Sequence, residues 1–355
     1  MQNSSNCPDL TNSSMNAVGD LCFSTVKSPT IKLILYVLIF SLIVATLIGN
    51  VLVVISIAYF KQLRSSTHYF VLSLAVADFL VGVTVMPYSM IRTIEGCWHF
   101  GNLFCQFHSS LDVMFCTASI LHLSCIAFDR YYAVCNPLLY GYKMSSQRVA
   151  ALIVTCWIVP VLISFVPIML GLHMQGIESV LPENICVLLV NRVYAVCASS
   201  VAFYLPMLLM LSAYWKIYKA ARKQALQIHA IEKQVSSPGT TQGKRKYSMR
   251  RERKAAKTLG VIISIFLAFW TPFFTANVVD PFIGYRTGMV VWEVFIWLGY
   301  VNSAINPLLY GFFHRSFRKA FLIIIGGRIC MSGSSSITNL SKAKLEVVET
   351  IDKLL

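Results

Sequence analysis

The sequence predicts an all-α membrane protein, a seven-transmembrane helix bundle followed by a short amphipathic eighth helix. Hydrophobic residues make up 56% of the 355 residues and charged residues only 13%, about half the charged share of an ordinary soluble domain. The apolar residues gather in runs, and a run of about 20 is long enough to cross a bilayer. We expect these runs to be helical, because the bilayer core has no water to satisfy a free backbone.

Seven apolar runs are predicted to cross the membrane. They cover about 33–60, 67–92, 104–135, 147–170, 194–217, 257–280 and 288–311. Polar residues interrupt the third and seventh runs, so these two assignments depend partly on flanks and length. The chain then divides into an N-terminal segment 1–32, a transmembrane domain 33–312 with a third inner loop at about 218–255, an amphipathic surface helix 313–330 and a disordered tail 331–355.

The basic residues predict the orientation of the bundle. Five of the 30 Lys and Arg residues fall on the side of the N-terminus, and they are Lys27, Lys32, Arg92, Arg192 and Arg286. Lys and Arg concentrate in cytoplasmic loops, so we expect a multi-pass plasma-membrane protein with an extracellular N-terminus and a cytoplasmic C-terminus. The formal net charge of +15 then reflects topology, and nucleic acid is not an expected partner.

The two ends of the chain carry candidate modification sites. The N-terminus lacks the basic start and apolar core of a cleavable signal peptide, so the first helix is expected to be an uncleaved anchor. On the outer side, Asn3 and Asn12 open glycosylation sequons, whereas the sequon at Asn339 lies inside and is discounted. Cys330 follows a basic amphipathic stretch and is a candidate palmitoylation site, with a free thiol as the equal alternative.

The cysteines separate by compartment. Five lie in apolar helices and are expected to be small core residues, namely Cys116, Cys125, Cys135, Cys156 and Cys197. Five lie in or next to oxidising outer space, where disulfides persist, namely Cys7, Cys22, Cys97, Cys105 and Cys186. Because five is odd, at least one of these pairs outside the chain or stays free. A Cys7–Cys22 pair is one possibility.

Costly polar groups lie within the apolar runs, and such groups are functional candidates by default. Asp112 stands in SSLDVMF with no basic residue nearby in sequence, and Asp78 stands in LAVADFL. Six prolines are expected to kink their helices, because each removes a backbone hydrogen bond; they are Pro87, Pro160, Pro167, Pro206, Pro272 and Pro307. Kinks and internal polar groups indicate moving parts, although a transporter or a channel would show the same features.

A set of short motifs follows in a fixed order along the chain. They are GN at 49–50, LAVAD at 74–78, Trp98 before Cys105, DRYYAVCNPLLY at 129–140, Trp157, Pro206, FLAFWTPFF at 266–274 and NSAINPLLY at 302–310. Each is weak alone, but in this order the chain resembles a rhodopsin-like (class A) G-protein-coupled receptor over about residues 33–325. The resemblance implies a receptor and not an enzyme, and the sequence has no phosphate loop, metal-ligand cluster or nucleophile motif.

Within that class the chain resembles the aminergic receptors. Asp112 stands 18 residues before Arg130, which is five helical turns, so both lie on one face at opposite ends. In the family the matching carboxylate pairs with the ammonium of the ligand, and Asp112 is therefore expected to bind a protonated amine. An aspartate paired inside the bundle is the alternative.

Closer still, the chain resembles the trace amine-associated receptors. The evidence is CWHFG at 97–101, the DRYYAVCNPL stretch and an NSxxNPxxYxFF pattern at the end of the seventh run. The chain departs from that family where FFHRSFRKA follows the seventh run, where Cys186 is alone in the second outer loop and where Phe269 replaces the usual cysteine. We favour a divergent trace amine receptor over another monoamine receptor, which would be serotonin-, histamine- or dopamine-like.

The resemblance implies an aromatic amine pocket, since cations are also attracted to ring faces. Its expected residues are Asp112, Val113, Cys116, Ser199, Trp270, Phe273, Phe274, Trp297 and Tyr300. Tyr300 is expected to hydrogen-bond Asp112, whereas helix packing explains Trp297 equally well. In catecholamine receptors, serines of the fifth helix bind the ring hydroxyls. Here position 198 is alanine and cannot donate, and only Ser199 is well placed, so a catechol ligand is disfavoured.

The outer mouth of the pocket carries acids that would receive the second ammonium of a diamine or polyamine. They are Glu293, Asp280, Glu183 and Glu95. For each one singly, a solvated loop acid is the commoner explanation. The resemblance also implies a Cys105–Cys186 disulfide, which would fix the second outer loop over the pocket.

The resemblance further implies a conformational switch. A sodium and water site would be built by Asp78, Asn50, Ser119, Asn302, Ser303 and Asn306. Ile120, Pro206 and Phe266 match the packing trio below the pocket. The inner motif is Asp129-Arg130-Tyr131, with Arg130 held at rest by Asp129 and Glu252 and stabilised, once freed, by Tyr214 and Tyr310.

These expectations describe a receptor for a protonated biogenic or trace amine that signals through the stimulatory heterotrimeric G protein to cAMP. Arrestin, receptor kinases and membrane lipid are the other implied partners, with Ser236, Ser237 and Ser248 of the flexible third inner loop as kinase sites. No cofactor is expected apart from an allosteric sodium ion. Olfactory expression would fit the family, although no residue reports it. An amine transporter is disfavoured because the seven runs contain no inverted repeat.

Overall fold

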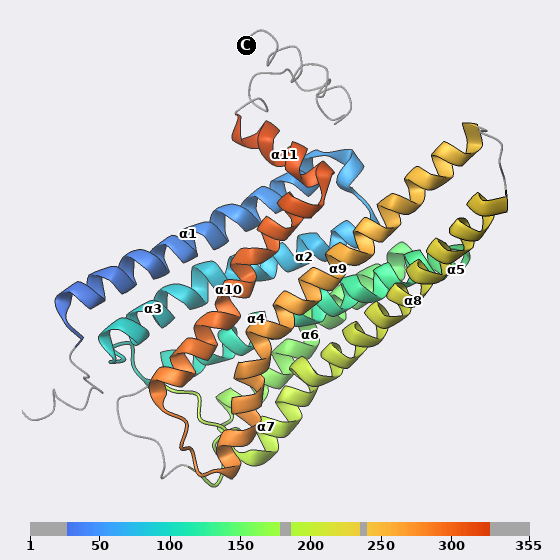
Figure 1. Ribbon diagram of the computed structural model, residues 1–355. Coiled ribbons are helices and arrows are strands. Elements are labelled where there is room, and N and C mark those ends of the chain that lie inside the picture. The colour runs from blue at the N-terminus through green and yellow to red at the C-terminus, as the bar shows by residue number, and fades with distance from the viewer. Residues whose placement is uncertain (1–26, 178–185, 235–239, 327–355) are drawn as a thin grey trace, which may run out of the picture.

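The computed structural model describes residues 27–177, 186–234 and 240–326. Inside the helices of that part, the side chains of 224–226, 228–234, 240–259 and 313 are not described. The described residues form a bundle of long helices that lie side by side and contain no β-strand (Figure 1). We refer to the end where the first helix begins as the N-terminal end of the bundle.

Several sequence expectations fall outside the described residues. They are the glycosylation sites Asn3 and Asn12, the outer acid Glu183, the kinase sites Ser236 and Ser237, the palmitoylation site Cys330 and the tail 331–355. The side chains of Glu252 and Ser248 are likewise not described, although both residues lie on a helix.

The helices follow the predicted runs along the chain. The main helices are α1 (Pro29–Tyr59), α2 (Ser66–Leu80), α3 (Met86–Glu95), α4 (Asn102–Cys135), α6 (Ser146–Met169), α7 (Arg192–Ser199), α8 (Leu205–Gln234), α9 (Thr240–Val279) and α10 (Met289–Phe313). The shorter elements are η1 (Lys61–Leu63), α5 (Pro137–Lys143), η5 (Asp280–Phe282) and α11 (Arg315–Ile325). Two π-helical turns, η2 (Val81–Val85) and η4 (Ser200–Tyr204), join α2 to α3 and α7 to α8.

In the described part of the chain, 6 helical spans are long and apolar enough to cross a membrane. They correspond to the first six predicted runs. The seventh run is α10, which is not among them by composition because it carries Glu293, Asn302 and Asn306. Its 25 residues still exceed the length that a bilayer needs, and it packs against α1 and α9. The structure therefore confirms the predicted seven-helix bundle and the short eighth helix.

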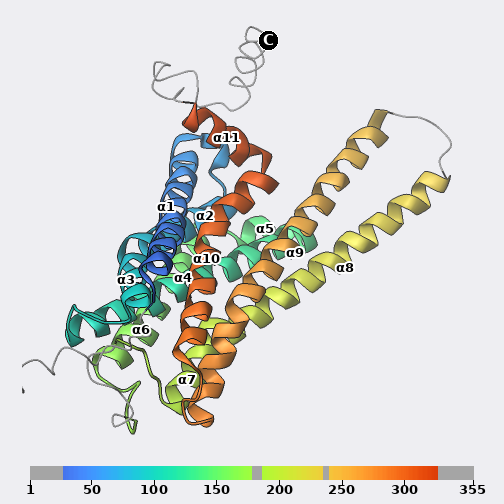
Figure 2. The ribbon, with the colours of Figure 1, turned by 60° about the vertical axis from the view of Figure 1, so that its left-hand side comes forward.

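The third inner loop is more helical than the sequence suggested. We expected a flexible loop at about 218–255, but α8 continues to Gln234 and α9 begins at Thr240. Figure 2 shows the two helices extending past the rest of the bundle as an antiparallel pair. The reason is local, since Ala, Lys, Arg, Gln and Glu dominate this stretch and favour helix. Extending an existing helix also avoids the cost of nucleating a new one.

The two π-helical turns lie next to prolines, and sequence reasoning predicted only kinks there. Pro87 lies at the start of α3, and Pro206 at the start of α8. A proline ring clashes with the carbonyl four residues before it and leaves that carbonyl without its N–H partner. Widening the preceding turn relieves the clash. The turn η2 sets the rotation of α3, and with it the side chains that α3 presents to the bundle interior.

The core fixes the position of α4, which packs against α2, α6 and α8. One buried cluster contains Ile120, Phe203 and Phe266, with Trp270 and Phe274 toward the N-terminal end. A second, smaller cluster contains Phe115 and Tyr300. With apolar residues holding two sides of α4, its remaining face points into the bundle.

The short helix α11 lies across the end of the bundle opposite the N-terminal end, against α1 and α10 (Figure 1). Its Phe317 is buried, with its ring centroid 5.6 Å from that of Tyr310 and 5.4 Å from that of His68. Leu322 and Ile325 are exposed. One apolar face therefore anchors α11 to the bundle, while further apolar residues face outward, as expected for a helix lying on a membrane surface.

Candidate functional site

A pocket opens among α4, α7, α9 and α10 near the N-terminal end of the bundle. The predicted residues that line it are Asp112, Val113, Cys116, Ser199, Trp270, Phe273, Phe274 and Tyr300. The segment Cys186–Val190 covers one side of the pocket. Trp297 does not line it; its indole donates to Thr93 Oγ1 at 3.0 Å, and its ring packs edge-on against Tyr300 with 5.1 Å between centroids. Trp297 is therefore a helix-packing residue, which is one of the two explanations that the sequence left open.

Asp112 is held at the pocket wall with one side open. The hydroxyl of Tyr300 donates to Asp112 Oδ2 at 2.7 Å, as predicted, and the thiol of Cys116 donates to Oδ1 at 3.3 Å. Among the described residues no lysine, arginine or histidine forms an ion pair with this carboxylate. The pocket therefore presents an oriented anion that has hydrogen-bond donors but no counter-ion.

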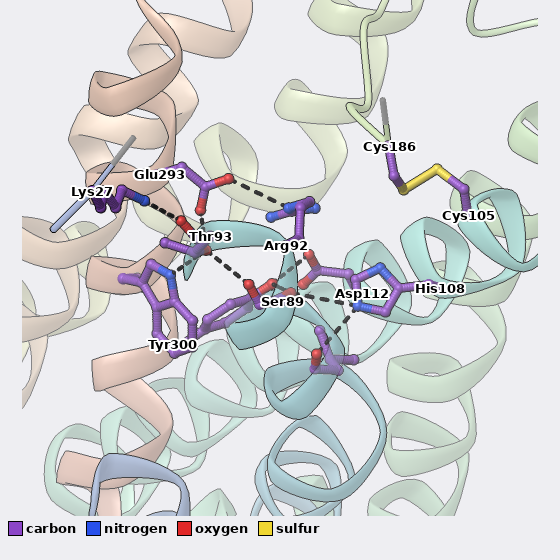
Figure 3. Close-up of polar contacts among 12 residues, drawn as sticks. Lys27, Ser89, Arg92, Thr93, Cys105, His108, Asp112, Cys186, Glu293 and Tyr300 are labelled. Carbon is purple, nitrogen blue, oxygen red and sulfur yellow. Dashed lines mark hydrogen bonds and ion pairs between the residues drawn. A yellow bond between two sulfur atoms is a disulfide. The ribbon is translucent and has the colours of Figure 1, made fainter. Parts of the chain in front are cut away.

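A series of hydrogen bonds behind Tyr300 fixes the position of its hydroxyl (Figure 3). Because this hydroxyl donates to Asp112, it must accept from Ser89 Oγ, 3.1 Å away. His108 Nε2 lies 3.2 Å from Val85 O and 3.4 Å from Ser89 Oγ. A carbonyl only accepts, so Nε2 carries the proton. Sequence reasoning missed Ser89 and His108, although His108 stands one turn before Asp112.

The floor of the pocket is aromatic. Phe203 and Phe274 stack with 4.5 Å between centroids, and Trp270 lies 5.7 Å from Phe274 and 6.1 Å from Phe273. The indole of Trp270 lies against Gly299 of α10, where a Cβ atom would come within 2.8 Å of the ring. Only glycine allows this approach, so Gly299 sets the position of the floor.

A second polar group lies on the wall formed by α7 and α9. Asn277 Nδ2 donates to Ser199 Oγ at 3.0 Å, and both residues line the pocket. Ser199 was predicted and Asn277 was not. Its position two turns after Trp270 on the same face of α9 was the available signal.

The predicted Cys105–Cys186 disulfide is confirmed, with 5.6 Å between the Cα atoms. It ties the start of α4 to the segment that covers the pocket. The hydroxyl of Tyr285 donates to Val190 O at 2.9 Å and holds the other end of that segment. Cys97 is also disulfide-bonded. The five cysteines in apolar helices are free thiols, and their burial varies. Cys156 is buried in the core as predicted and Cys116, Cys125 and Cys135 are partly buried, whereas Cys197 is exposed and is not the core residue that was expected.

Each described outer acid already has partners. Glu293 forms an ion pair with Arg92, with 3.3 Å between Oε1 and Nε, and its Oε2 lies against Thr93 Oγ1. Asp280 is buried and accepts from the Thr287 backbone N–H at 2.9 Å and the Trp292 indole at 3.3 Å. Of the described outer acids, only Glu293 lines the pocket.

Glu95 lies away from the pocket and pairs with the N-terminal end of α1. Its carboxylate is 2.7 Å from Lys32 Nζ and accepts from the Tyr36 hydroxyl at 2.9 Å. Both charged groups are about one-third exposed, so the pair contributes little to stability. Its role is local, and it holds α1 against α3.

The predicted sodium and water site brings its residues together in the middle of the bundle. Asp78 is fully buried and accepts from Ser303 Oγ and Asn306 Nδ2, both at 2.8 Å. Three further buried atoms have no hydrogen-bond partner, namely Ser119 Oγ, Asn50 Oδ1 and Asn302 Nδ2. Hard cations take oxygen ligands, so the two unpartnered oxygens beside a carboxylate fit such an ion, and the amide donor suits water.

At the opposite end of the bundle, Asp129 is fully buried and surrounded by donors. Arg130 Nη2 lies 2.6 Å from Asp129 Oδ2, and Thr67 Oγ1 donates to the same oxygen at 2.6 Å. The Tyr140 hydroxyl donates to Oδ1 at 2.9 Å. Burial and the neighbouring Asp129 carboxylate raise the pKa of Tyr140. Thr67 and Tyr140 were not predicted from the sequence.

The other predicted switch residues lie between the pocket floor and this end of the bundle. Ile120, Pro206 and Phe266 are buried, and Ile120 and Phe266 belong to the same core cluster. Tyr131 lies beneath Lys216, whose Nζ is 5.2 Å from the ring centroid. Tyr214 lies against Gly260 of α9, and Tyr310 packs on Phe317. In the described part of the chain neither tyrosine forms a hydrogen bond with Arg130, so their role toward a freed Arg130 stays a prediction.

Comparisons with known proteins agree with this geometry. A sequence profile described as "7 transmembrane receptor (rhodopsin family)" matches residues 49–310. The human 5-hydroxytryptamine receptor 4 is 44% identical over 309 residues, covering 83% of this chain and 80% of the relative. The rat trace amine-associated receptor 4 is 40% identical over 340 residues, covering 93% of this chain and 97% of the relative.

The human trace amine-associated receptor 1 is 39% identical over 325 residues, covering 90% of this chain and 95% of the relative. The serotonin and trace amine receptors are thus about equally similar, and the comparisons do not separate the two groups that the sequence left open. The family consists of receptors and not enzymes. The match over most of the chain, together with Asp112 in the pocket, means that this chain belongs to the rhodopsin family of seven-transmembrane receptors, in its aminergic group.

Proposed function

We propose that this receptor binds a protonated aryl monoamine through Asp112 and signals through the stimulatory heterotrimeric G protein to cAMP. One observation carries the ligand class. The Asp112 carboxylate faces the pocket, is oriented by Tyr300 and has no cationic partner among the described residues. A primary alkylammonium ion would supply the missing charge and three N–H donors.

The surroundings of Asp112 favour an ammonium over a neutral ligand. A hydrogen bond between two charged groups is roughly twice as strong as one between neutral groups. The aromatic floor of Trp270, Phe273 and Phe274 adds ring faces that attract a cation and surface that packs an aryl group. The pocket therefore matches a molecule with an ammonium at one end and a ring at the other.

The wall of Ser199 and Asn277 supports a polar substituent on the ring. The hydrogen bond between them leaves the Ser199 hydroxyl proton and the Asn277 carbonyl oxygen for a ligand. Ala198 also lines the pocket and offers no donor, which disfavours a catechol. A single ring hydroxyl, as in 5-hydroxytryptamine or a phenolic trace amine, suits this wall.

The remaining assignments follow from the family and the charge pattern. We propose an extracellular N-terminal end and a cytoplasmic opposite end, where the G protein, arrestin and receptor kinases would bind. Sodium would bind at Asp78 with Ser119 and Asn50 as neighbouring oxygen donors. A cation there would compensate the buried carboxylate and favour the resting state.

The test is a screen of arylethylamines, with and without a ring hydroxyl and including 5-hydroxytryptamine, on cells that express the full chain. The readout is cAMP, with Asp112→Asn as the variant and Glu95→Gln as the matched control, since Glu95 does not line the pocket. A response lost in Asp112→Asn and kept in Glu95→Gln supports the proposal. Uptake of the amine without cAMP would support the transporter alternative instead.

A further inference from the structure

Arg92 is a buried cation in the wall of the pocket. It lies on α3, and its side chain is only 12% exposed. It lines the pocket together with Asp112 and Glu293, and these three are the only charged side chains among the described residues that do so. Figure 3 shows the guanidinium between the two carboxylates. A charge in this position must influence which ligands the pocket accepts.

The partner of Arg92 is Glu293, and both oxygens of Glu293 are occupied. Oε1 lies 3.3 Å from Arg92 Nε, and Oε2 lies against Thr93 Oγ1. The single proton of this hydroxyl is shared with the backbone carbonyl of Ser89, 2.7 Å away. Thr93 is itself fixed, because its hydroxyl accepts from the Trp297 indole and its backbone carbonyl accepts from Lys27 Nζ. Glu293 is therefore held toward Arg92 by Thr93, which Trp297 and Lys27 fix in turn.

The guanidinium is not fully neutralised by this pair. Its shortest contact with Glu293 is through Nε, at 3.3 Å, and the buried Nη2 has no hydrogen-bond partner in the described part of the chain. Asp112 acts on the same guanidinium electrostatically but forms no ion pair with it. Arg92 therefore keeps part of its positive charge toward the pocket.

The charges of the pocket wall match a single positive charge on the ligand. Two carboxylates and one guanidinium leave one negative charge, which one ammonium at Asp112 compensates. A second ammonium would have to lie beside Arg92 or displace it from Glu293. Like charges brought together in a pocket of low dielectric repel each other strongly.

We propose that Arg92 is a specificity-determining residue, which serves as the built-in counter-ion of Glu293 and so restricts the pocket to ligands with one ammonium. The inference rests on the proposed function, because it requires that Asp112 binds the first ammonium. Removing the charge of Arg92 should therefore widen the class of ligands that the pocket accepts. Without the Arg92 charge, Glu293 becomes available as a second acceptor for a diamine.

The experiment compares arylalkylamines with the same compounds carrying a second aminoalkyl group, and measures cAMP potency for each matched pair. The receptors are the full-length wild type, Arg92→Gln, Arg92→Lys and the double variant Arg92→Gln/Glu293→Gln, all with surface expression measured. The wild type should prefer the monoamine. Arg92→Gln removes the charge and keeps a donor for Glu293, so it should shift the potency ratio toward the diamine by about tenfold or more.

The two other variants identify the cause of the shift. Arg92→Lys keeps the positive charge and should keep the wild-type ratio. The double variant lacks the Glu293 charge and should return to the wild-type ratio. An unchanged ratio in a surface-expressed Arg92→Gln receptor overturns the proposal. A shift that persists in the double variant, or that Arg92→Lys reproduces, overturns it as well.

Failure of the proposed function gives a different pattern. In that case the wild type responds to neither series, or its response does not depend on Asp112, and both proposals fall together. If monoamines act through Asp112 and only the diamine ratio is insensitive to Arg92, the specificity role alone is overturned.

Discussion

Asp112 and Asp129 lie on the same helix, α4, and differ in what surrounds them. Asp129 is fully buried and accepts from Arg130 and Tyr140, so its charge is compensated inside the protein. Asp112 accepts from Tyr300 at the edge of a pocket and has no cationic partner among the described residues. A paired aspartate holds two elements together, whereas an oriented and unpaired aspartate is a place for a ligand.

The largest effect is expected at Asp112, the aspartate without a cationic partner among the described residues. Asp112→Asn keeps the size of the side chain and removes its charge, so amine potency should fall by about 100-fold or more, the cost of losing one partner of a buried charge pair. The measurement is cAMP potency with surface expression measured in parallel. Full potency in an expressed Asp112→Asn receptor would mean that the ammonium binds elsewhere.

The hydrogen bond from Tyr300 accounts for the orientation of Asp112. Tyr300→Phe removes one hydrogen bond to a charged group, which is worth roughly 1.5–3 kcal/mol, so potency should fall by about tenfold or more. Tyr88→Phe is the control, because Tyr88 packs against Phe100 and Phe104 and does not line the pocket. Equal losses in the two variants would contradict an orienting role for Tyr300.

Substitution of Asp129, the aspartate whose charge is paired with Arg130, should change basal activity rather than ligand potency. Asp129→Asn weakens the hold on Arg130, so cAMP without ligand should rise by about fivefold, as expected if roughly 1 kcal/mol of stabilisation of the resting state is lost. Tyr140→Phe removes only one donor to Asp129 and should raise basal cAMP less. Unchanged basal cAMP in both variants would show that the Asp129 cluster does not hold the resting state.

The smallest expected effect is at the ring end of the pocket. Ser199→Ala removes one neutral hydrogen bond, worth about 1 kcal/mol, so potency should fall by about fivefold for amines with a ring hydroxyl. The same amines without the hydroxyl serve as the control and should lose nothing. A loss of equal size for both series would mean that Ser199 acts through packing.

The sequence predicted most of the bundle because hydropathy and helix length are local properties. The Cys105–Cys186 disulfide followed from the family resemblance and is confirmed. Asp112, Tyr300 and Trp270 followed from the same resemblance and line one pocket, and their role in binding stays a prediction. The third inner loop was mispredicted, because Gly, Ser and Pro near its middle were given more weight than the helix formers around them.

The partners of Arg92 and Glu293 were not predictable, because each comes from another helix. Glu293 appeared to be a free acid near the outer mouth, and only the fold brings it within 3.3 Å of Arg92. From the sequence, Arg92 contributed only to predicting the orientation of the chain in the membrane. Its entry into the pocket depends on the rotation of α3, which the π-helical turn η2 sets. Asn277 was missed for the same reason, since its pairing with Ser199 requires the packing of α9 on α7.

One double-mutant cycle tests directly whether the ligand ammonium pairs with the carboxylate of Asp112. The binding of an arylethylamine and of its neutral analogue, in which a hydroxyl replaces the ammonium, would be measured on the wild type and on Asp112→Asn. If the ion pair forms, losing the ammonium should weaken binding strongly in the wild type and little in Asp112→Asn. Equal losses in the two receptors would contradict the ion pair.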